Sequence, residues 1–314
     1  MSATAVISVQ GLTKDFPVAG RTLRAVDSVS LEVSAGETLG IVGESGCGKS
    51  TLARLMLRLA PATSGRITLL GTDITHLDQT RMQPYRRHIQ AVFQDPVSSL
   101  NPRMIVRDII GEPLRRLALG RSDITARVDR MLALVGLPPD SATRYPHAFS
   151  GGQRQRIAIA RALAAEPQLV ICDEATSALD VSVQAQILNL LADLQAELGL
   201  ALIFVSHNLG AVRHVSHKVA VMYLGRIVEV GPSDAIFARP AHPYTQALLA
   251  SVPEPDPDLQ VPPPLPGEVP NPLDKPRGCH FHPRCPKATT QCRSEDPPEA
   301  AIDAMHRVRC FHPG

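Results

Sequence analysis

Buried strands and amphipathic helices alternate along this chain, and the alternation predicts an α/β domain. Four short, largely apolar runs, typical of buried strands, occupy residues 38–42, 89–93, 169–172 and 202–205, and the run 169–172 is continuously apolar. Helical spacing of apolar residues follows the first three runs, and the longest helical region extends from 106 to 165. We expect the four runs to form a central sheet that helices cover.

Alternating apolar positions predict further strands around this core. The region from Ile7 to Val33 is strand-like, and a second alternation follows at Ile67 and Leu69. Residues 219–223 and 227–230 predict a terminal hairpin. Phe16 falls in a short turn-rich gap of the first region, where an aromatic ring could either stack on a nucleotide base or belong to the core.

Composition and charge narrow the class of protein. The 314 residues suffice for one large α/β domain with an appendage, or for two modest domains. The net charge of +2 gives no argument for a nucleic-acid partner. No apolar run approaches the roughly 18–20 residues of a membrane span, and the first ten residues lack the plan of a signal peptide. We therefore expect a cytosolic protein that reaches a membrane only through a partner.

A phosphate-binding motif follows the first buried strand. It matches G-x-x-x-x-G-K-[ST] and is followed by apolar residues at helical spacing. Its residues are Gly43, Glu44, Ser45, Gly46, Cys47, Gly48, Lys49, Ser50 and Thr51. The backbone N–H groups would wrap the phosphates of a nucleoside triphosphate, Lys49 would add a full positive charge, and Ser50 would place its hydroxyl on Mg²⁺.

A second helix start has similar anion-binding features. Ser150, Gly151, Gly152 and Gln153 come directly before a helix predicted for residues 154–164. Exposed N–H groups, a small hydroxyl and the positive end of the helix dipole could bind phosphate there, or Ser150 could be an ordinary helix cap. Two phosphate-directed helix starts in one chain require an explanation.

Polar side chains follow three of the buried strands. Gln94 ends the second run, Asp173 and Glu174 end the third, and His207 follows the fourth. Because ligands gather at the carboxyl ends of strands in parallel α/β sheets, we expect these side chains at one edge. There Asp173 could hold Mg²⁺ through water, and Glu174 could orient or deprotonate an attacking water.

The cysteines fall into two sets. Cys47 and Cys172 lie inside the nucleotide motifs, whereas the others crowd the end of the chain at Cys279, Cys285, Cys292 and Cys310. This second set has the spacing C-x5-C-x6-C-x17-C, which matches neither zinc fingers nor ferredoxins, so spacing alone leaves the metal open. Nearby histidines could complete a zinc site, or the cysteines could be unpaired thiols in a Pro-rich tail that holds half of the 28 prolines.

Taken together, these motifs closely resemble those of the ATP-binding subunits of ABC transporters. The ordered set comprises the loop Gly43 to Thr51, Gln94, the Ser150 to Gln153 signature, Asp173 with Glu174, the Ser177 to Asp180 loop and His207. The resemblance implies a P-loop NTPase fold with a mixed central sheet, an antiparallel β subdomain and a helical signature subdomain. Phe149 stands where the family usually has leucine.

The resemblance also implies roles and explains the two phosphate-directed helix starts. Two cassettes would dimerise head to tail, so that Lys49 of one chain and Ser150 of the other hold the same ATP. Glu174 would be the catalytic base, His207 would contact the γ-phosphate, and Gln94 would reach the Mg²⁺ and the attacking water. Phe16 would stack on adenine.

A narrower resemblance is to the dipeptide and oligopeptide importer branch, which also includes nickel and glutathione importers. It rests on the segment from Phe93 to Arg103, the run from Asp180 to Gln186, and residues His242 to Thr245. This branch implies a second ATPase (a copy or a paralogue), two membrane permeases and an external solute-binding protein. The chain would then lie peripherally on the cytoplasmic face of the bacterial inner membrane, where the segment after Gln94 meets a permease.

Members of that branch carry a similar C-terminal cysteine set, and the resemblance implies a [4Fe–4S] cluster there, with Zn²⁺ as the alternative. We expect residues 1–250 to form the ATP-binding domain, with a helical subdomain of about residues 95–167. Residues 251–314 would then be an irregular, Pro- and Cys-rich appendage.

Four other kinds of ABC protein are less consistent with the chain. DNA-repair members need a long coiled coil, for which the segment between Thr51 and Ser150 is too short. Ribosome-acting members carry two cassettes, whereas each motif occurs once here, and a decayed regulatory ATPase would not keep Lys49, Asp173, Glu174 and His207. An exporter subunit is the nearest rival, and the C-terminal segment favours import.

Overall fold

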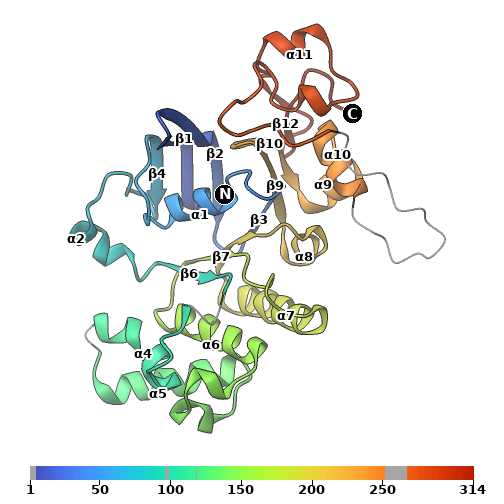
Figure 1. Cartoon of the computed structure of the whole chain (residues 1–314). Helices are drawn as coiled ribbons and strands as arrows, with labels where there is room; N and C mark the ends of the chain where they lie inside the picture. Colours follow the sequence, from blue (N-terminus) through green and yellow to red (C-terminus); the bar gives the residue numbers. More distant parts are fainter. Residues whose placement is uncertain (1–4, 96–98, 118, 252–266) are drawn as a thin grey trace, which may run out of the picture. The chain divides into compact units, whose positions relative to one another are not determined.

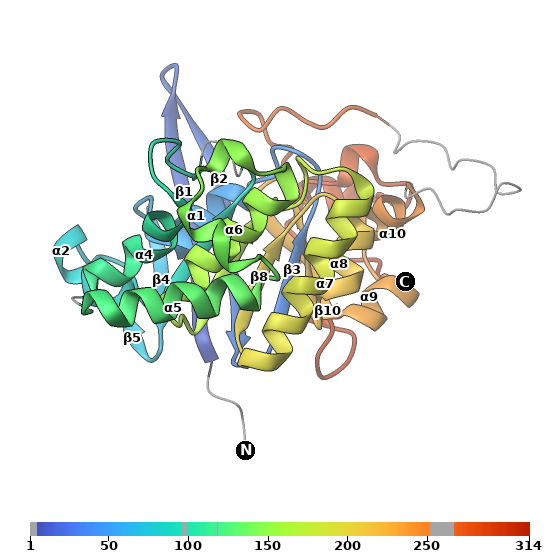
Figure 2. The ribbon, with the colours of Figure 1, turned by 90° about the horizontal axis from the view of Figure 1, so that it is seen from below.

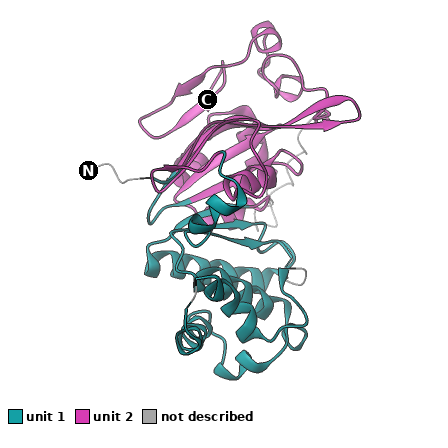
Figure 3. Cartoon of the chain, turned by 90° about the vertical axis from the view of Figure 1, so that its left-hand side faces the viewer, with its two compact units in different colours: residues 1–7, 33–38, 76–205 teal, residues 8–32, 39–75, 206–314 magenta. Residues whose placement is uncertain are grey.

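The computed structural model of the chain describes residues 5–95, 99–117, 119–251 and 267–314 (Figure 1; seen from below in Figure 2). The chain divides into two compact units (Figure 3). Unit 1 contains residues 1–7, 33–38 and 76–205, and unit 2 contains residues 8–32, 39–75 and 206–314.

The sheet of unit 1 consists of parallel strands whose carboxyl ends are level. β6 (Ile89–Phe93), β7 (Leu169–Asp173) and β8 (Ala201–Val205) are neighbours in this order. Phe93 is in register with Asp173, and Asp173 is in register with Val205. β7 and β8 are buried along their whole length, which confirms the strands predicted from the continuous apolar runs.

Helices make up most of the remaining described part of unit 1. α4 (Val106–Arg116), α5 (Arg121–Leu134) and α6 (Gly151–Ala164) pack against one another, and α7 (Val181–Leu198) packs on α6. α7 buries an apolar stripe that includes Ile187, Leu191 and Leu194, and it ends at Gly199 in a left-handed conformation, as its sequence predicts. The shorter elements are α2 (Gln79–Met82), η1 (Gln83–Tyr85), η2 (Pro139–Thr143) and η3 (Pro146–Ala148).

One sheet of unit 2 carries the phosphate-loop strand. β3 (Thr38–Val42) pairs in parallel with β9 (Lys218–Tyr223), which forms the predicted hairpin with β10 (Arg226–Pro232). The sheet continues antiparallel through β12 (Arg307–Arg309) to β11 (Glu299–Ala301). The helices of unit 2 are α1 (Lys49–Met56), α8 (Leu209–Val215), α9 (Ser233–Ala238), α10 (Pro243–Ala250), η4 (His282–Arg284) and α11 (Thr290–Ser294).

A second sheet has the strand order β2-β1-β4-β5. Its strands are β2 (Arg21–Ser34), β1 (Ala5–Val18), β4 (Ser64–Leu69) and β5 (Thr72–Asp73). Phe16 lies within β1 and not in a turn-rich gap, because the turn is made later, by Ala19 and Gly20, which both have positive φ. The helix after the phosphate loop ends at Met56, and beyond its end Arg58 has positive φ and Leu59 is 54% exposed.

The described part of the C-terminal appendage is more regular than predicted. Residues 267–314 form η4, α11 and a β11–β12 hairpin, and β12 adds to the sheet by pairing with β10. Phe281 and Val308 are each 1% exposed, and Phe281 packs against Tyr223 and Tyr244, so this segment shares a core with the rest of unit 2. Most of the predicted linker, residues 252–266, lies outside the described residues. Among the helices of the described ranges, none is long and apolar enough to cross a membrane.

Candidate nucleotide-binding site

The phosphate loop joins the buried strand β3 to α1, and its path requires glycine. A Cβ on Gly43 would lie 2.1 Å from the carbonyl oxygen of Met222, and one on Gly48 would lie 2.2 Å from the carbonyl oxygen of Ala25. Gly48 also has φ +109, which L side chains rarely adopt. The loop is therefore packed tightly between two neighbouring segments of unit 2.

The N-cap residue of α1 provides no side-chain cap. It is Gly48, and the first turn of the helix contains no acidic residue. The neighbouring Cys47 thiol accepts a hydrogen bond from the Lys49 N–H. The positive end of the helix dipole thus faces a position that an anion can occupy. Ser45 and Gly46 are exposed beside it, and Ser50 and Thr51 lie in the first turn of α1.

Lys49 is buried within the loop itself. Its side chain donates hydrogen bonds from Nζ to the carbonyl oxygens of Gly43 (2.8 Å) and Glu44 (2.9 Å). The Cys47 sulfur lies 3.8 Å from Nζ, and burial raises the pKa of this thiol. No salt bridge of the described residues involves Lys49, so its charge is available to a bound anion.

Phe16 and His207 also belong to unit 2. The Phe16 ring is half-buried in β1, and the Lys14 ammonium lies 4.9 Å from its centroid. His207 is exposed and lies between Ser206, whose N–H donates to the Ile41 carbonyl at 3.1 Å, and Asn208, which caps α8. The backbone beside His207 is therefore joined to β3, the strand that leads into the phosphate loop. The roles predicted for Phe16 and His207 remain predictions.

Unit 1 brings Gln94, Asp173 and Glu174 to one edge. Gln94 follows β6 directly, and the in-register pairing of Phe93 with Asp173 places it level with Glu174. Asp173 is 8% exposed at the end of β7. Glu174 has φ +50, and its N–H donates to the Val205 carbonyl at 2.9 Å, so the backbone turns sharply where the strand ends.

Two residues near this edge, Cys172 and Asp180, have pKa values shifted by their surroundings. Burial raises the pKa of Cys172, inside β7, to about 12, so this thiol stays protonated and inert. Asp180 closes the Ser177 to Asp180 loop by capping α7, accepting hydrogen bonds from the Val183 N–H (2.9 Å) and the Ser182 hydroxyl (2.8 Å). The Val183 N–H is the main cause of the lowered pKa of Asp180.

Ser150 caps α6 within its own chain. Its hydroxyl accepts from the Gln153 N–H at 3.4 Å, and its N–H donates to Gln153 Oε1 at 3.0 Å, which makes a complete capping box. Ser150, Gly151 and Gln153 are exposed, whereas Gly152 packs against Val183. The first turn of α6 is thus presented to solvent, and both readings of this motif fit the geometry.

The iron–sulfur prediction is contradicted by the structure. Across the described ranges, which include Cys279, Cys285, Cys292 and Cys310, no group of three or more His, Cys, Asp or Glu residues is arranged to hold a metal ion. Instead the thiols join local contacts: Cys292 Sγ lies 3.4 Å from the Thr289 hydroxyl, and Cys310 Sγ accepts from the His312 N–H at 3.3 Å. Burial raises the pKa of Cys279 to about 11, which favours a neutral thiol. The zinc alternative is contradicted by the same finding.

Two contacts to the phosphate loop were not predicted from the sequence. The Glu44 N–H donates to the Tyr244 hydroxyl at 3.0 Å, and the Arg284 guanidinium donates to both carboxylate oxygens of Glu44. The proline at the start of α10 indicates a helix there but gives no sign that the next residue, Tyr244, reaches the loop. Nothing in the pattern around Arg284 indicates its partner.

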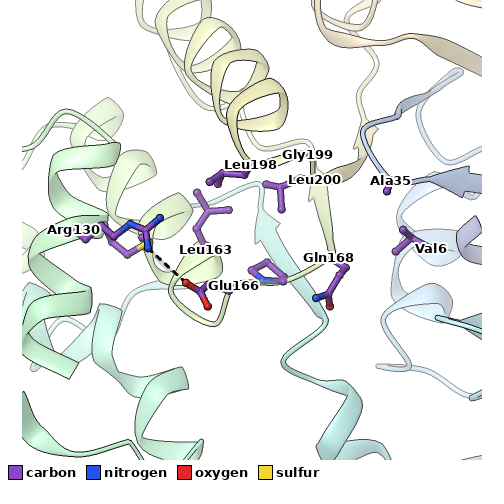
Figure 4. A pocket seen from close by; sticks show the side chains of 11 residues that line it. Val6, Ala35, Arg130, Leu163, Glu166, Gln168, Leu198, Gly199 and Leu200 are labelled. Atoms are coloured by element: carbon purple, nitrogen blue, oxygen red, sulfur yellow. Dashed lines mark ion pairs between the residues drawn. The ribbon is translucent and has the colours of Figure 1, made fainter. Parts of the chain in front are cut away.

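A pocket of about 310 Å³ in unit 1 is not a candidate for this site (Figure 4). Gln168 and Leu200, which line it, come directly before β7 and β8, so it lies at the amino ends of these strands. Ligands of α/β sheets bind at the opposite, carboxyl ends, where Asp173 and Glu174 are. An ion pair of 3.7 Å joins Arg130 to Glu166 at its rim.

The fold and the phosphate loop define an ATP-binding cassette. The family model for ABC transporters matches residues 26–177, and the model for the C-terminal region of oligopeptide/dipeptide transporters matches residues 228–292. A dimeric cassette, MJ0796, solved in a post-hydrolysis state with ADP and phosphate, is 28% identical with a TM-score of 0.66, over 72% of this chain and 98% of that one. The cassette cbiO1 from Clostridium perfringens, part of the ABC transporter complex cbiONQ, is 29% identical with a TM-score of 0.67, over 74% and 91%.

Curated relatives place the chain more narrowly. A probable peptide ABC transporter ATP-binding protein, y4tS, of Sinorhizobium fredii is 55% identical over 98% of this chain and 89% of the relative. The oligopeptide transport ATP-binding protein OppF of Salmonella typhimurium is 52% identical over 93% and 88%, and the di/tripeptide transport protein DppF of Pseudomonas aeruginosa is 47% identical over 98% and 97%. The chain belongs to the family of ATP-binding proteins of peptide ABC transporters.

Proposed function

We propose that this protein hydrolyses ATP to power the import of dipeptides and oligopeptides by a binding-protein-dependent ABC transporter. The observation that carries the proposal is the N-terminus of α1, where the N-cap residue Gly48 supplies no side-chain cap and the buried Lys49 donates only to loop carbonyls and lies near the Cys47 sulfur. Such an end binds triphosphate through N–H groups and charge. The peptide substrate rests on the names of the relatives y4tS, OppF and DppF.

Mg²⁺ fits the oxygen donors of the chain. Asp173 and Gln94 supply a carboxylate and an amide oxygen at one edge of unit 1, and Ser50 supplies a hydroxyl in the first turn of α1. Mg²⁺ prefers such hard oxygen ligands. A Mg²⁺ ion held there with ATP would neutralise charge on the phosphate oxygens. Glu174 would accept the proton of the attacking water, and His207 would contact the γ-phosphate.

The proposed function includes a dimer of two cassettes within a larger transporter. Two cassettes dimerise head to tail, so that the exposed start of α6 in one chain covers the ATP bound at α1 of the other. The solved relative MJ0796 is itself a dimer. ATP then favours the closed dimer because it contacts both chains only in that state, and hydrolysis releases it. Two permeases and a solute-binding protein complete the transporter, with residues 1–250 as the ATP-binding domain and 251–314 as an extension at the cytoplasmic face of the inner membrane.

Glu174→Gln tests the catalytic step. Loss of the general base should reduce ATP hydrolysis by about 100-fold or more, while ATP binding stays near the wild-type level because no phosphate contact is removed. ATP should also trap the variant as a dimer, measured by size-exclusion chromatography with and without ATP. Glu197→Gln is the matched control, since Glu197 is exposed on α7. Wild-type turnover by Glu174→Gln would exclude the base role.

Uptake by cells identifies the solute. Cells carrying wild type or Glu174→Gln are given labelled dipeptide, a longer peptide, nickel or glutathione. Selective loss of peptide uptake in the variant is the expected result. Loss of nickel or glutathione uptake alone would keep the ATPase role and replace the substrate, and unchanged uptake of all four would contradict the import proposal.

A further inference from the structure

The C-terminal extension reaches the phosphate loop through one side chain. Arg284 Nη1 donates to Glu44 Oε2 at 2.9 Å, and Nη2 donates to Glu44 Oε1 at 3.0 Å, although the residues are 240 positions apart. The Arg284 side chain is 4% exposed and the Glu44 side chain 22% exposed. Hydrogen bonding to Glu44 is also the main cause of the raised pKa of Arg284. A bidentate pair shielded from water fixes both position and orientation.

Arg284 is itself firmly held. It ends the short turn η4, where its N–H donates to the Phe281 carbonyl at 3.0 Å. Phe281 packs edge-on against Tyr223 and Tyr244, with ring centroids 5.4 Å apart in both pairs. His242 lies beside the same ring, and burial lowers its pKa to about 3, which keeps it neutral. An aromatic cluster therefore anchors the turn from which Arg284 extends.

Further polar contacts secure the extension around this cluster. Lys275 donates to the Leu224 carbonyl at 2.6 Å, and Asp296 pairs with Arg226 at 2.5 Å. His306 contacts the buried Glu229 at 2.7 Å. The contacts are spread over the sequence of the extension, so the position of Arg284 depends on the whole described segment.

Glu44 connects Arg284 to Lys49, the residue that would bind the phosphates of ATP. Arg284 holds its carboxylate, Tyr244 accepts from its N–H at 3.0 Å, and its carbonyl accepts from Lys49 Nζ at 2.9 Å. A shift of Glu44 would therefore displace the carbonyl that orients Lys49. Without Arg284, the Glu44 carboxylate would also be an unpaired negative charge next to the triphosphate.

We propose that Arg284 is a positioning residue for the phosphate loop, through which the C-terminal extension sets the affinity for ATP. The inference rests on the proposed function for the nucleotide itself. It assigns the extension a task in ATP binding that none of the ATPase motifs contains.

The test is a double-mutant cycle on the full chain. In Arg284→Gln, the dissociation constant of a fluorescent ATP analogue and the KM for ATP should both rise about tenfold, because the loop is released and the carboxylate is unpaired. The kcat of the folded protein should change less than about threefold, since no group at the reaction centre is altered. The double variant Arg284→Gln with Glu44→Gln should bind ATP no more weakly than Arg284→Gln alone, because both substitutions break the same pair.

Controls separate positioning from general stability. Arg277→Gln changes an exposed arginine of the same segment and should leave KM unchanged. Arg284→Lys keeps the charge without the fork and should give an intermediate KM. A partly unfolded sample lowers the apparent kcat and not the KM, so a selective KM effect excludes a merely structural role.

Three outcomes overturn the inference: a wild-type KM in folded Arg284→Gln, additive effects in the double variant, or an equal KM rise in Arg277→Gln. If Arg284→Gln does not fold, Arg284→Lys and Glu44→Gln decide, and wild-type affinity in both overturns it. A wild type that binds the analogue without hydrolysing ATP contradicts the proposed function instead, and the binding cycle still tests Arg284.

Discussion

The N-termini of α1 and α6 are the two helix ends that the sequence predicts to bind phosphate, and they are capped differently. α1 begins at Gly48 in a left-handed conformation, with no side-chain cap and with Lys49 buried in the loop. α6 begins at Ser150, whose hydroxyl and N–H are both engaged by Gln153 in a capping box. The end without an N-cap side chain leaves N–H groups that an anion can bind, whereas the N-cap of the other end is already occupied within its own chain.

The difference in capping predicts different roles in ATP binding and hydrolysis for the N-termini of α1 and α6. α1 has the features of an anion site within a single unit, so ATP should bind to an isolated chain. α6 presents an exposed serine and glycine but has no buried lysine in its first turn, since its sequence starts Gly-Gly-Gln-Arg. We expect its contribution to appear only when a second chain supplies the nucleotide, in hydrolysis and not in the first binding step.

Lys49→Ala should have the largest effect among the variants that compare the α1 and α6 ends. The variant loses the charge that contacts the carbonyls of Gly43 and Glu44, and charge-assisted bonds of this kind contribute about 1.5–3 kcal/mol each. We expect the affinity for ATP to fall about 100-fold, measured by equilibrium binding of a fluorescent ATP analogue to the monomer. Lys287→Ala, on an exposed lysine of the extension, is the control. Wild-type affinity in Lys49→Ala would remove α1 as the primary site.

Local sequence patterns predicted the α1 end better than the α6 end. Periodicity and the glycine-lysine spacing are local properties, so β3, the loop and the start of α1 could be placed from the sequence. The choice between phosphate site and helix cap at Ser150 could not, because both uses need the same residues. Only the hydrogen bonds to Gln153 reveal which one the single chain adopts.

Long-range pairings account for most of what the sequence did not reveal. The Arg284–Glu44 pair and the addition of β12 to β10 depend on packing between distant segments, which no local pattern encodes. The iron–sulfur prediction, which the resemblance of the C-terminal cysteine set implied, is wrong, since closeness in sequence did not arrange the thiols of the described residues as ligands. Phe16 was placed in a turn because the true turn at Ala19 and Gly20 follows three residues later.

Alanine substitutions of Gly48 and Gly151, the glycines at the starts of α1 and α6, compare the two helix ends directly. We expect their effects to be intermediate in size. In Gly48→Ala, the Cβ would lie 2.2 Å from the Ala25 carbonyl at a φ of +109. We expect a loss of about 1–3 kcal/mol in the free energy of unfolding and a loss of ATP binding. In Gly151→Ala, the Cβ would meet only Leu179 Cδ2 at 3.4 Å, an ordinary contact. ATP binding to this monomer should stay within about twofold of wild type.

For both glycine variants, denaturant unfolding gives the free energy of unfolding, and equilibrium binding to the monomer gives the affinity for ATP. The pair is matched, because each adds one methyl group at the start of a phosphate-directed helix. Equal losses of ATP affinity in both variants would show that α6 already contacts nucleotide in the isolated chain, against the division inferred from the caps.

Ser150→Ala has the smallest expected effect on folding and tests α6 directly. Removing the hydroxyl leaves the Gln153 N–H without its cap and should cost about 0.5–1 kcal/mol of unfolding free energy, at the low end for N-caps because the site is exposed. Asp78→Ala is the matched control, since Asp78 is the exposed N-cap of α2 in the same unit and accepts from the Arg81 N–H at 2.8 Å. Both variants should bind ATP as monomers like wild type, but only Ser150→Ala should hydrolyse it more slowly, by about tenfold if the hydroxyl exchanges Gln153 for the partner's phosphate. Equal hydrolysis by the two variants would assign Ser150 to capping alone, and the start of α6 would then have no role in closing the dimer.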